Sequence, residues 1–142
     1  MPSVFSAAPM PPALSPEHAL AYVRELSADV RAVAVLDAAG ALLAGDAQVA
    51  RAAAPLLRAG AELEAVRERG VVCLARDDRH AVVAACGPLA LPGIVRSDLR
   101  AVLAALSGTP PAVPARAAEE PSTALGAAAD AVISAAQRGA AA

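Results

Sequence analysis

The stretch "RAVAVLDAAGALLAGD" (Arg31 to Asp46) decides the fold. Two apolar runs, AVAVL and ALLAG, flank the break DAAG, which ends in glycine. Asp37 suits the first position of a tight turn, where its carboxylate can accept bonds from the amides ahead, and Gly40 suits a position with positive φ. The stretch therefore predicts a β-hairpin. Since neither strand has a polar side, we expect helices to cover both faces of the hairpin.

A second group of strands lies between residues 62 and 86. The runs VVCLAR (71–76) and HAVVAAC (80–86) are nearly all apolar and flank the turn DDR, which is typical of two central strands joined by a hairpin. The segment 62–69 is strongly charged, with Leu63 and Val66 as its main apolar residues, which is typical of an edge strand.

Three segments, 15–27, 46–60 and 93–106, have the apolar spacing of helices. Pro55 lies deep in the second segment, so we expect a kink there, or a split into a short turn and a restart. The order helix, two strands, helix, three strands, helix predicts an α/β (α+β) domain. Its five-stranded antiparallel sheet should have helices on both faces.

The two ends of the chain have a different composition from the centre. Residues 1–14 predict a disordered leader, and the proline-rich residues 109–122 predict an extended linker after a domain spanning 15–108. Residues 123–142 predict an alanine-rich helix or tail. A frayed tail is the preferred interpretation, and the alternative is a helix that docks through Leu125, Val132 and Ile133.

Composition excludes several functions. The 57% of hydrophobic residues includes much alanine, so the core is modest and association is a natural supplement. All basic residues are dispersed arginines and the net charge is −2, which argues against nucleic-acid binding. The proline-broken amino terminus resembles neither a signal peptide nor a membrane span, so we expect a cytoplasmic protein without a membrane partner.

The sequence offers no catalytic or metal centre. We expect Cys73 and Cys86 to be two buried thiols beyond disulfide reach, and no His or Cys cluster has the spacing of metal ligands. No serine lies in a nucleophile elbow, and the acidic pair Asp77 and Asp78 suits a turn. We therefore expect neither an enzyme nor a bound cofactor.

Two stretches resemble the roadblock family, the dynein light chain relatives that occur in bacteria and archaea as partners of Ras-like GTPases. AVAVLDAAGALLAGD resembles the first hairpin of that family. VVCLARDDRHAVVAACGPLALPGIVRSDL resembles its last hairpin running into the final helix, and the portion PGIVRSDL is similar to the entry into that helix. The resemblance covers about residues 15–106.

The resemblance implies a profilin-like fold, with the second helix on one face of the sheet and the first and third on the other. It also implies homodimers that join through the second helix and the third strand into one continuous sheet. The positions that would carry this interface are Val49, Ala53, Leu56, Leu57, Leu63 and Val66. The charges of the edge strand suit either a two-fold pairing of opposite signs or an ordinary protected edge.

The resemblance further implies a non-enzymatic interaction module, a homodimeric regulator or scaffold that binds a small Ras-like GTPase. The absence of a GxxxxGK[ST] loop agrees with a protein that binds no nucleotide itself. Arg51 and Arg58 are the candidate partner-binding residues, and the alternative is that they are solvated helix charges. A small-molecule sensor, or a signalling scaffold without a GTPase partner, is the alternative function, although Phe5 and Tyr22 supply few aromatic walls for a pocket.

Overall fold

The computed structural model describes residues 14–26, 28–108 and 123–141. The helices in these ranges are α1 (Pro16–Leu26), α2 (Ala47–Ala52), α3 (Ala54–Leu57), α4 (Pro92–Ser107) and α5 (Thr123–Ala141). The strands are β1 (Val30–Asp37), β2 (Leu42–Gly45), β3 (Glu62–Arg67), β4 (Gly70–Arg76) and β5 (His80–Cys86). The expected leader and linker, apart from Leu14, lie outside the described residues.

The five strands form one antiparallel sheet in the order β2-β1-β5-β4-β3. Pairing of β1 with β5, with Val35 opposite Val82, joins the first hairpin to the second group of strands. The prediction of a five-stranded antiparallel sheet with β4 and β5 in its centre and β3 at its edge is confirmed. The expectation that helices cover both strands of the first hairpin is right only for β1. Because β2 is the other edge, Leu42 and Leu43 remain more than a third exposed.

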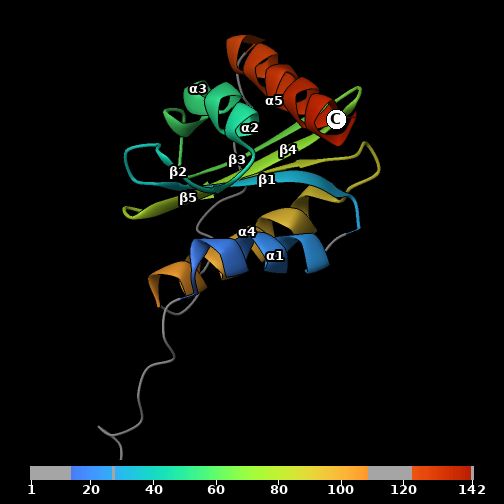
Figure 1. Ribbon diagram of the computed structural model, residues 1–142. Coiled ribbons are helices and arrows are strands. Elements are labelled where there is room, and N and C mark those ends of the chain that lie inside the picture. The colour runs from blue at the N-terminus through green and yellow to red at the C-terminus, as the bar shows by residue number, and fades with distance from the viewer. Residues whose placement is uncertain (1–13, 27, 109–122, 142) are drawn as a thin grey trace, which may run out of the picture.

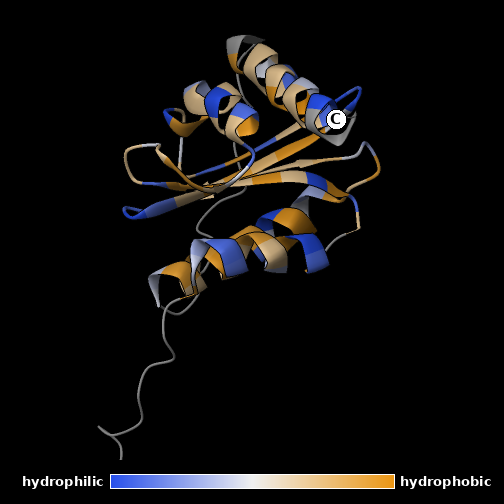
Figure 2. Cartoon of the chain, viewed as in Figure 1, coloured by the Kyte–Doolittle hydropathy of each residue, from blue (hydrophilic) through white to orange (hydrophobic). Residues whose placement is uncertain are grey.

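Helices cover both faces of the sheet, as Figure 1 shows. Helices α1 and α4 lie on one face, and α2, α3 and α5 lie on the other. Apolar residues of the strands alternate between the two faces and pack into two separate clusters. Figure 2 shows the same division, since the apolar colour follows the strands and the inner sides of the helices.

Local sequence explains the ends of several elements. The Oδ1 atom of Asp37 accepts hydrogen bonds from the amides of Ala39 and Ala41, both at 2.9 Å, and Gly40 has a φ of 89°. The predicted turn chemistry is therefore confirmed. Pro55 splits the second predicted helix into α2 and α3, because proline fits the first turn of a helix and not its interior.

Helix α5 is part of the domain, and the preferred interpretation of a frayed tail is wrong. Its Val132 and Ile133 are at most 2% exposed, and Leu125 is half-buried against the same cluster. The many alanines let the helix lie close to α2 and to the sheet. The folded unit therefore extends beyond the predicted boundary at residue 108. No helix among the described residues is long and apolar enough to cross a membrane.

Candidate functional site

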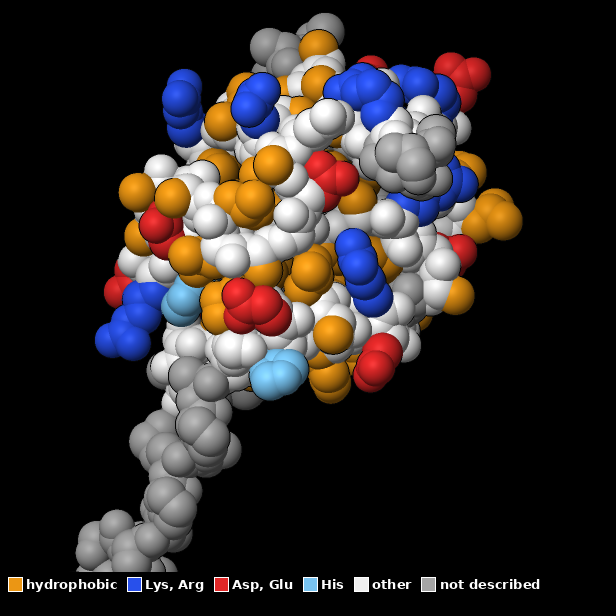
Figure 3. All heavy atoms as spheres, viewed as in Figure 1, with side chains coloured by type: hydrophobic (Ala, Val, Ile, Leu, Met, Phe, Trp, Pro, Cys, Tyr) orange, Lys and Arg blue, Asp and Glu red, His pale blue; other side chains and the backbone are white. Residues whose placement is uncertain are grey.

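The two predicted partner-binding residues lie on the surface formed by α2 and α3. Arg51 is exposed on α2, and Arg58 is the C-cap residue of α3 and is also exposed. Neither guanidinium forms an ion pair or a hydrogen bond with a described residue. Figure 3 shows several arginine side chains over the upper part of the molecule, where α2, α3 and α5 lie. This surface is therefore basic and available for contact.

The six predicted interface residues divide into two groups. Four of them are at most 4% exposed because residues of the same chain cover them, and these are Val49, Ala53, Leu56 and Leu63. Leu57 is half-buried, and Val66 is 66% exposed. The four buried side chains are not accessible to a second copy, whereas Val66 is accessible as the domain stands.

Polar contacts hold α5 to the hairpin between β3 and β4. The Nε and Nη2 atoms of Arg67 donate to the carboxylate of Asp130 at 3.0 and 2.9 Å. Arg69 donates to Ser134 Oγ at 2.7 Å and to Gln137 Oε1 at 3.1 Å. The hydrogen bond from Arg67 lowers the pKa of Asp130. These bonds fix the position of α5 along the sheet. The apolar side chains of α5 pack into the buried cluster on that face.

The outer edge of β3 has unpaired main-chain groups. The amide of Arg76 donates to the carbonyl of Ala61 at 2.8 Å, which fixes which residues of β3 exchange hydrogen bonds with β4. In an antiparallel pair, every second residue points its main-chain N–H and C=O groups toward the partner strand, so Leu63, Ala65 and Arg67 face β4 as Ala61 does. The main-chain groups of the intervening residues Glu62, Glu64 and Val66 therefore point toward the open edge.

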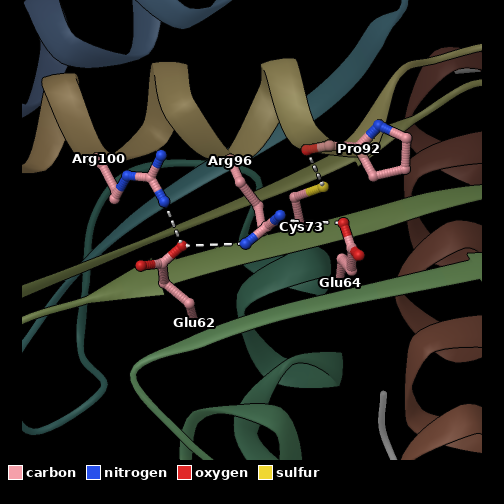
Figure 4. Close-up of polar contacts among 6 residues, drawn as sticks. All are labelled: Glu62, Glu64, Cys73, Pro92, Arg96 and Arg100. Atoms are coloured by element: carbon pink, nitrogen blue, oxygen red, sulfur yellow. Dashed lines mark hydrogen bonds and ion pairs between the residues drawn. The ribbon is translucent and has the colours of Figure 1, made fainter. Parts of the chain in front are cut away.

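Glutamates of β3 form ion pairs with arginines of α4, as Figure 4 shows. Arg96 contacts Glu64 at 3.2 Å and Glu62 at 3.5 Å, and Arg100 contacts Glu62 at 2.9 Å. All four side chains are at least about three-quarters buried, so water screens the pairs less than it screens surface ion pairs. These contacts argue against a two-fold pairing through the opposite charges of the edge, because Glu62 and Glu64 are already paired with arginines of α4.

The two cysteines are free and buried, as predicted. Cys73 lies opposite Ala84 across the β4–β5 pair, and its Sγ donates to the carbonyl of Pro92 at 3.8 Å (Figure 4). Burial raises the pKa of Cys86 to about 11 and raises the pKa of Cys73 further. Because the reactive form of cysteine is the thiolate, both side chains are unreactive near neutral pH.

A pocket of about 220 Å³ opens where the β1–β2 turn, α3 and the β4–β5 turn meet. Arg58 and Arg76 both line it. The sequence singled out Arg58 but missed Arg76, because no local signal indicates that α3 lies over the end of β4. At the same turn, partial burial works to raise the pKa of Asp77, but hydrogen bonds from two backbone amides and from Ser107 lower it.

Among residues 14–26, 28–108 and 123–141, no group of three or more His, Cys, Asp or Glu side chains lies close enough to hold a metal ion. Comparison with known proteins adds no assignment. No protein-family model matches the chain, and no curated protein matches it either. What this domain can do therefore rests on three features: the edge of β3, the arginines beside α3, and the pocket.

Proposed function

We propose that the protein is a non-enzymatic interaction module that pairs with a second copy through β3 and binds a small Ras-like GTPase. The observation that carries the pairing is the open edge of β3. Its outward main-chain groups belong to Glu62, Glu64 and Val66, and Val66 is 66% exposed. An edge with unpaired groups and an exposed apolar side chain is a template for strand addition.

A second copy is the partner that fits this edge most simply. Two β3 strands running antiparallel would join two five-stranded sheets across a two-fold axis, and each would satisfy the other's main-chain groups. The ion pairs of Glu62 and Glu64 with α4 hold β3 in place, so little further ordering is needed. This contact differs from the predicted interface, because the four buried side chains take no part in it.

The exposed arginines support the GTPase part of the proposal. Arg51 and Arg58 lie on neighbouring elements and bond to no described residue. A guanidinium is suited to carboxylates and phosphates, which it can bind through two parallel hydrogen bonds. The two hairpins resemble those of the roadblock family, and this resemblance is the reason for proposing a small Ras-like GTPase as the partner.

Replacing Val66 by proline tests the pairing. The amide of Val66 points to the open edge, so proline is compatible with the strand but removes an outward donor. We expect the wild-type chain to have twice the mass of one chain by light scattering and Val66→Pro to have the mass of one. Val66→Ala keeps the amide and is the matched control, which should remain largely dimeric. A wild-type protein that stays monomeric at high concentration would contradict the pairing.

Nucleotide-dependent capture tests the GTPase partner. The full chain, immobilised, is incubated with an extract of the organism that encodes it, supplemented with a non-hydrolysable GTP analogue or with GDP. We expect a small GTPase to be recovered mainly in one nucleotide state, and the double variant Arg51→Glu, Arg58→Glu to recover at least about tenfold less. Arg24→Glu, on the opposite face, is the control. Equal recovery in both states, or recovery of no GTPase, would refute this part.

A further inference from the structure

We propose that the pocket beside α3 binds a small oxyanion, a phosphate or a carboxylate, between Arg58 and Arg76. This site would be a ligand-binding function of the single chain. It goes beyond the proposed function, because it requires neither a second copy nor a GTPase.

The two arginines converge from different elements. Arg76 is the last residue of β4, and strand alternation places its side chain on the same face as Leu74, the face that α3 covers. Arg58 ends α3 and lines the same pocket. Two arginines that are 18 positions apart in the sequence therefore line one concave site.

Neither guanidinium has a partner in the described part of the chain. Other arginines at the junctions between helices and the sheet are paired. Arg67, Arg96 and Arg100 each have a carboxylate oxygen within 3.2 Å. An anion bound at the pocket would give both guanidinium groups the hydrogen-bonding partner that they lack.

The acidic residues of the pocket, Asp37 and Asp77, form no ion pair with these arginines. Asp77 follows the last residue of β4, and its side chain accepts a hydrogen bond at 3.0 Å from Ser107 of α4, on the opposite face of the sheet. The Oδ1 atom of Asp37 accepts from two amides of its own turn. Both carboxylates thus accept hydrogen bonds within their own turns or from α4, and neither forms an ion pair with Arg58 or Arg76.

The size of the pocket selects a small ligand. Pockets for drug-sized molecules have about 300–1,000 Å³, and this one has about 220 Å³. The remaining walls on the α3 side are short or branched apolar side chains of Ala54, Leu57 and Ala81. A pocket of this size accommodates an oxyanion group. Because both arginines are exposed, binding should weaken as the salt concentration rises.

Titration of the ¹⁵N-labelled full chain, without any partner protein, tests the proposal. Inorganic phosphate and acetate are the two probes, and the tighter of them identifies the ligand class. We expect saturable shifts of the amide signals of Gly40, Arg58 and Arg76. Arg58→Gln and Arg76→Gln should each weaken binding by about tenfold or more. Arg24→Gln makes the same charge change on the opposite face and should leave the affinity unchanged.

The variant Arg76→Lys shows whether weaker anion binding results from the lost guanidinium group or from a misfolded strand. Lysine keeps the charge and the strand but lacks the forked donor geometry, so its affinity should fall between those of the wild type and Arg76→Gln. The proposal is overturned if neither anion gives saturable shifts. It is also overturned if folded Arg58→Gln and Arg76→Gln both bind as tightly as the wild type. Neither result would bear on pairing through β3 or on capture of a GTPase.

Discussion

Replacing Ile133 by aspartate is expected to release α5 from the domain and to lower the free energy of unfolding by about 4 kcal/mol. Ile133 is 2% exposed and packs among apolar residues of α2 and the sheet. Aspartate at this position would leave a cavity and place an unpaired charge in it. Urea denaturation of the full chain, followed by circular dichroism, measures the change.

Ala131→Asp is the matched control for this variant. Ala131 lies on the exposed side of α5, two residues from Ile133, so the same side chain would be introduced into water. The expected cost is less than about 1 kcal/mol, which is the difference in helix propensity between the two residues. If the two variants lose equal stability, α5 does not dock through Ile133 in solution.

Release of α5 has a consequence for association. With α5 in place, Val49, Ala53, Leu56 and Leu63 are covered by their own chain. In Ile133→Asp the part of the apolar cluster that α5 covers would become exposed, and we expect stronger binding of an apolar dye together with a larger mass in light scattering. Four of the six predicted interface residues belong to this cluster, so they are buried in a single chain.

Much of the sheet could be predicted because its signals are local. The turn at Asp37 and Gly40 follows from side-chain bonding and a positive φ. The split of the second helix follows from the position of Pro55. The edge position of β3 follows from its charges, although the sequence could not tell that Glu62 and Glu64 would be paired with α4.

The features that sequence patterns missed depend on contacts between distant segments. Helix α5 is alanine-rich and marginal by itself, so only its contact with α2 and the sheet reveals that it docks. The exposure of β2 depends on its place at the edge of the sheet, and apolar composition does not show that place. Arg76 became a candidate ligand-binding residue only when α3 was found to lie over the end of its strand.

Gly45→Ala is expected to lower the free energy of unfolding by about 3 kcal/mol or more. Gly45 has a φ of 107°, a conformation that side-chain-bearing residues rarely adopt. An added Cβ would also collide with the carbonyl oxygen of Val33. That oxygen belongs to the backbone of β1 in the middle of the sheet, so it cannot move aside as the end of a flexible side chain could.

Gly93→Ala is the control, because the same methyl group would meet nothing within 4 Å in the first turn of α4. Alanine has a higher helix propensity than glycine, so the free energy of unfolding of this variant should rise by up to about 1 kcal/mol in the same urea experiment.

Gly45→Ala should also disturb the start of α2, which carries Arg51. The next amide, that of Asp46, donates to Val33 at 3.1 Å, and the Asp46 carboxylate caps α2. A chain that tolerates Gly45→Ala as well as Gly93→Ala would mean that β2 does not approach β1 this closely in solution. The position of α2 and its Arg51 would then lack the support that this close approach gives.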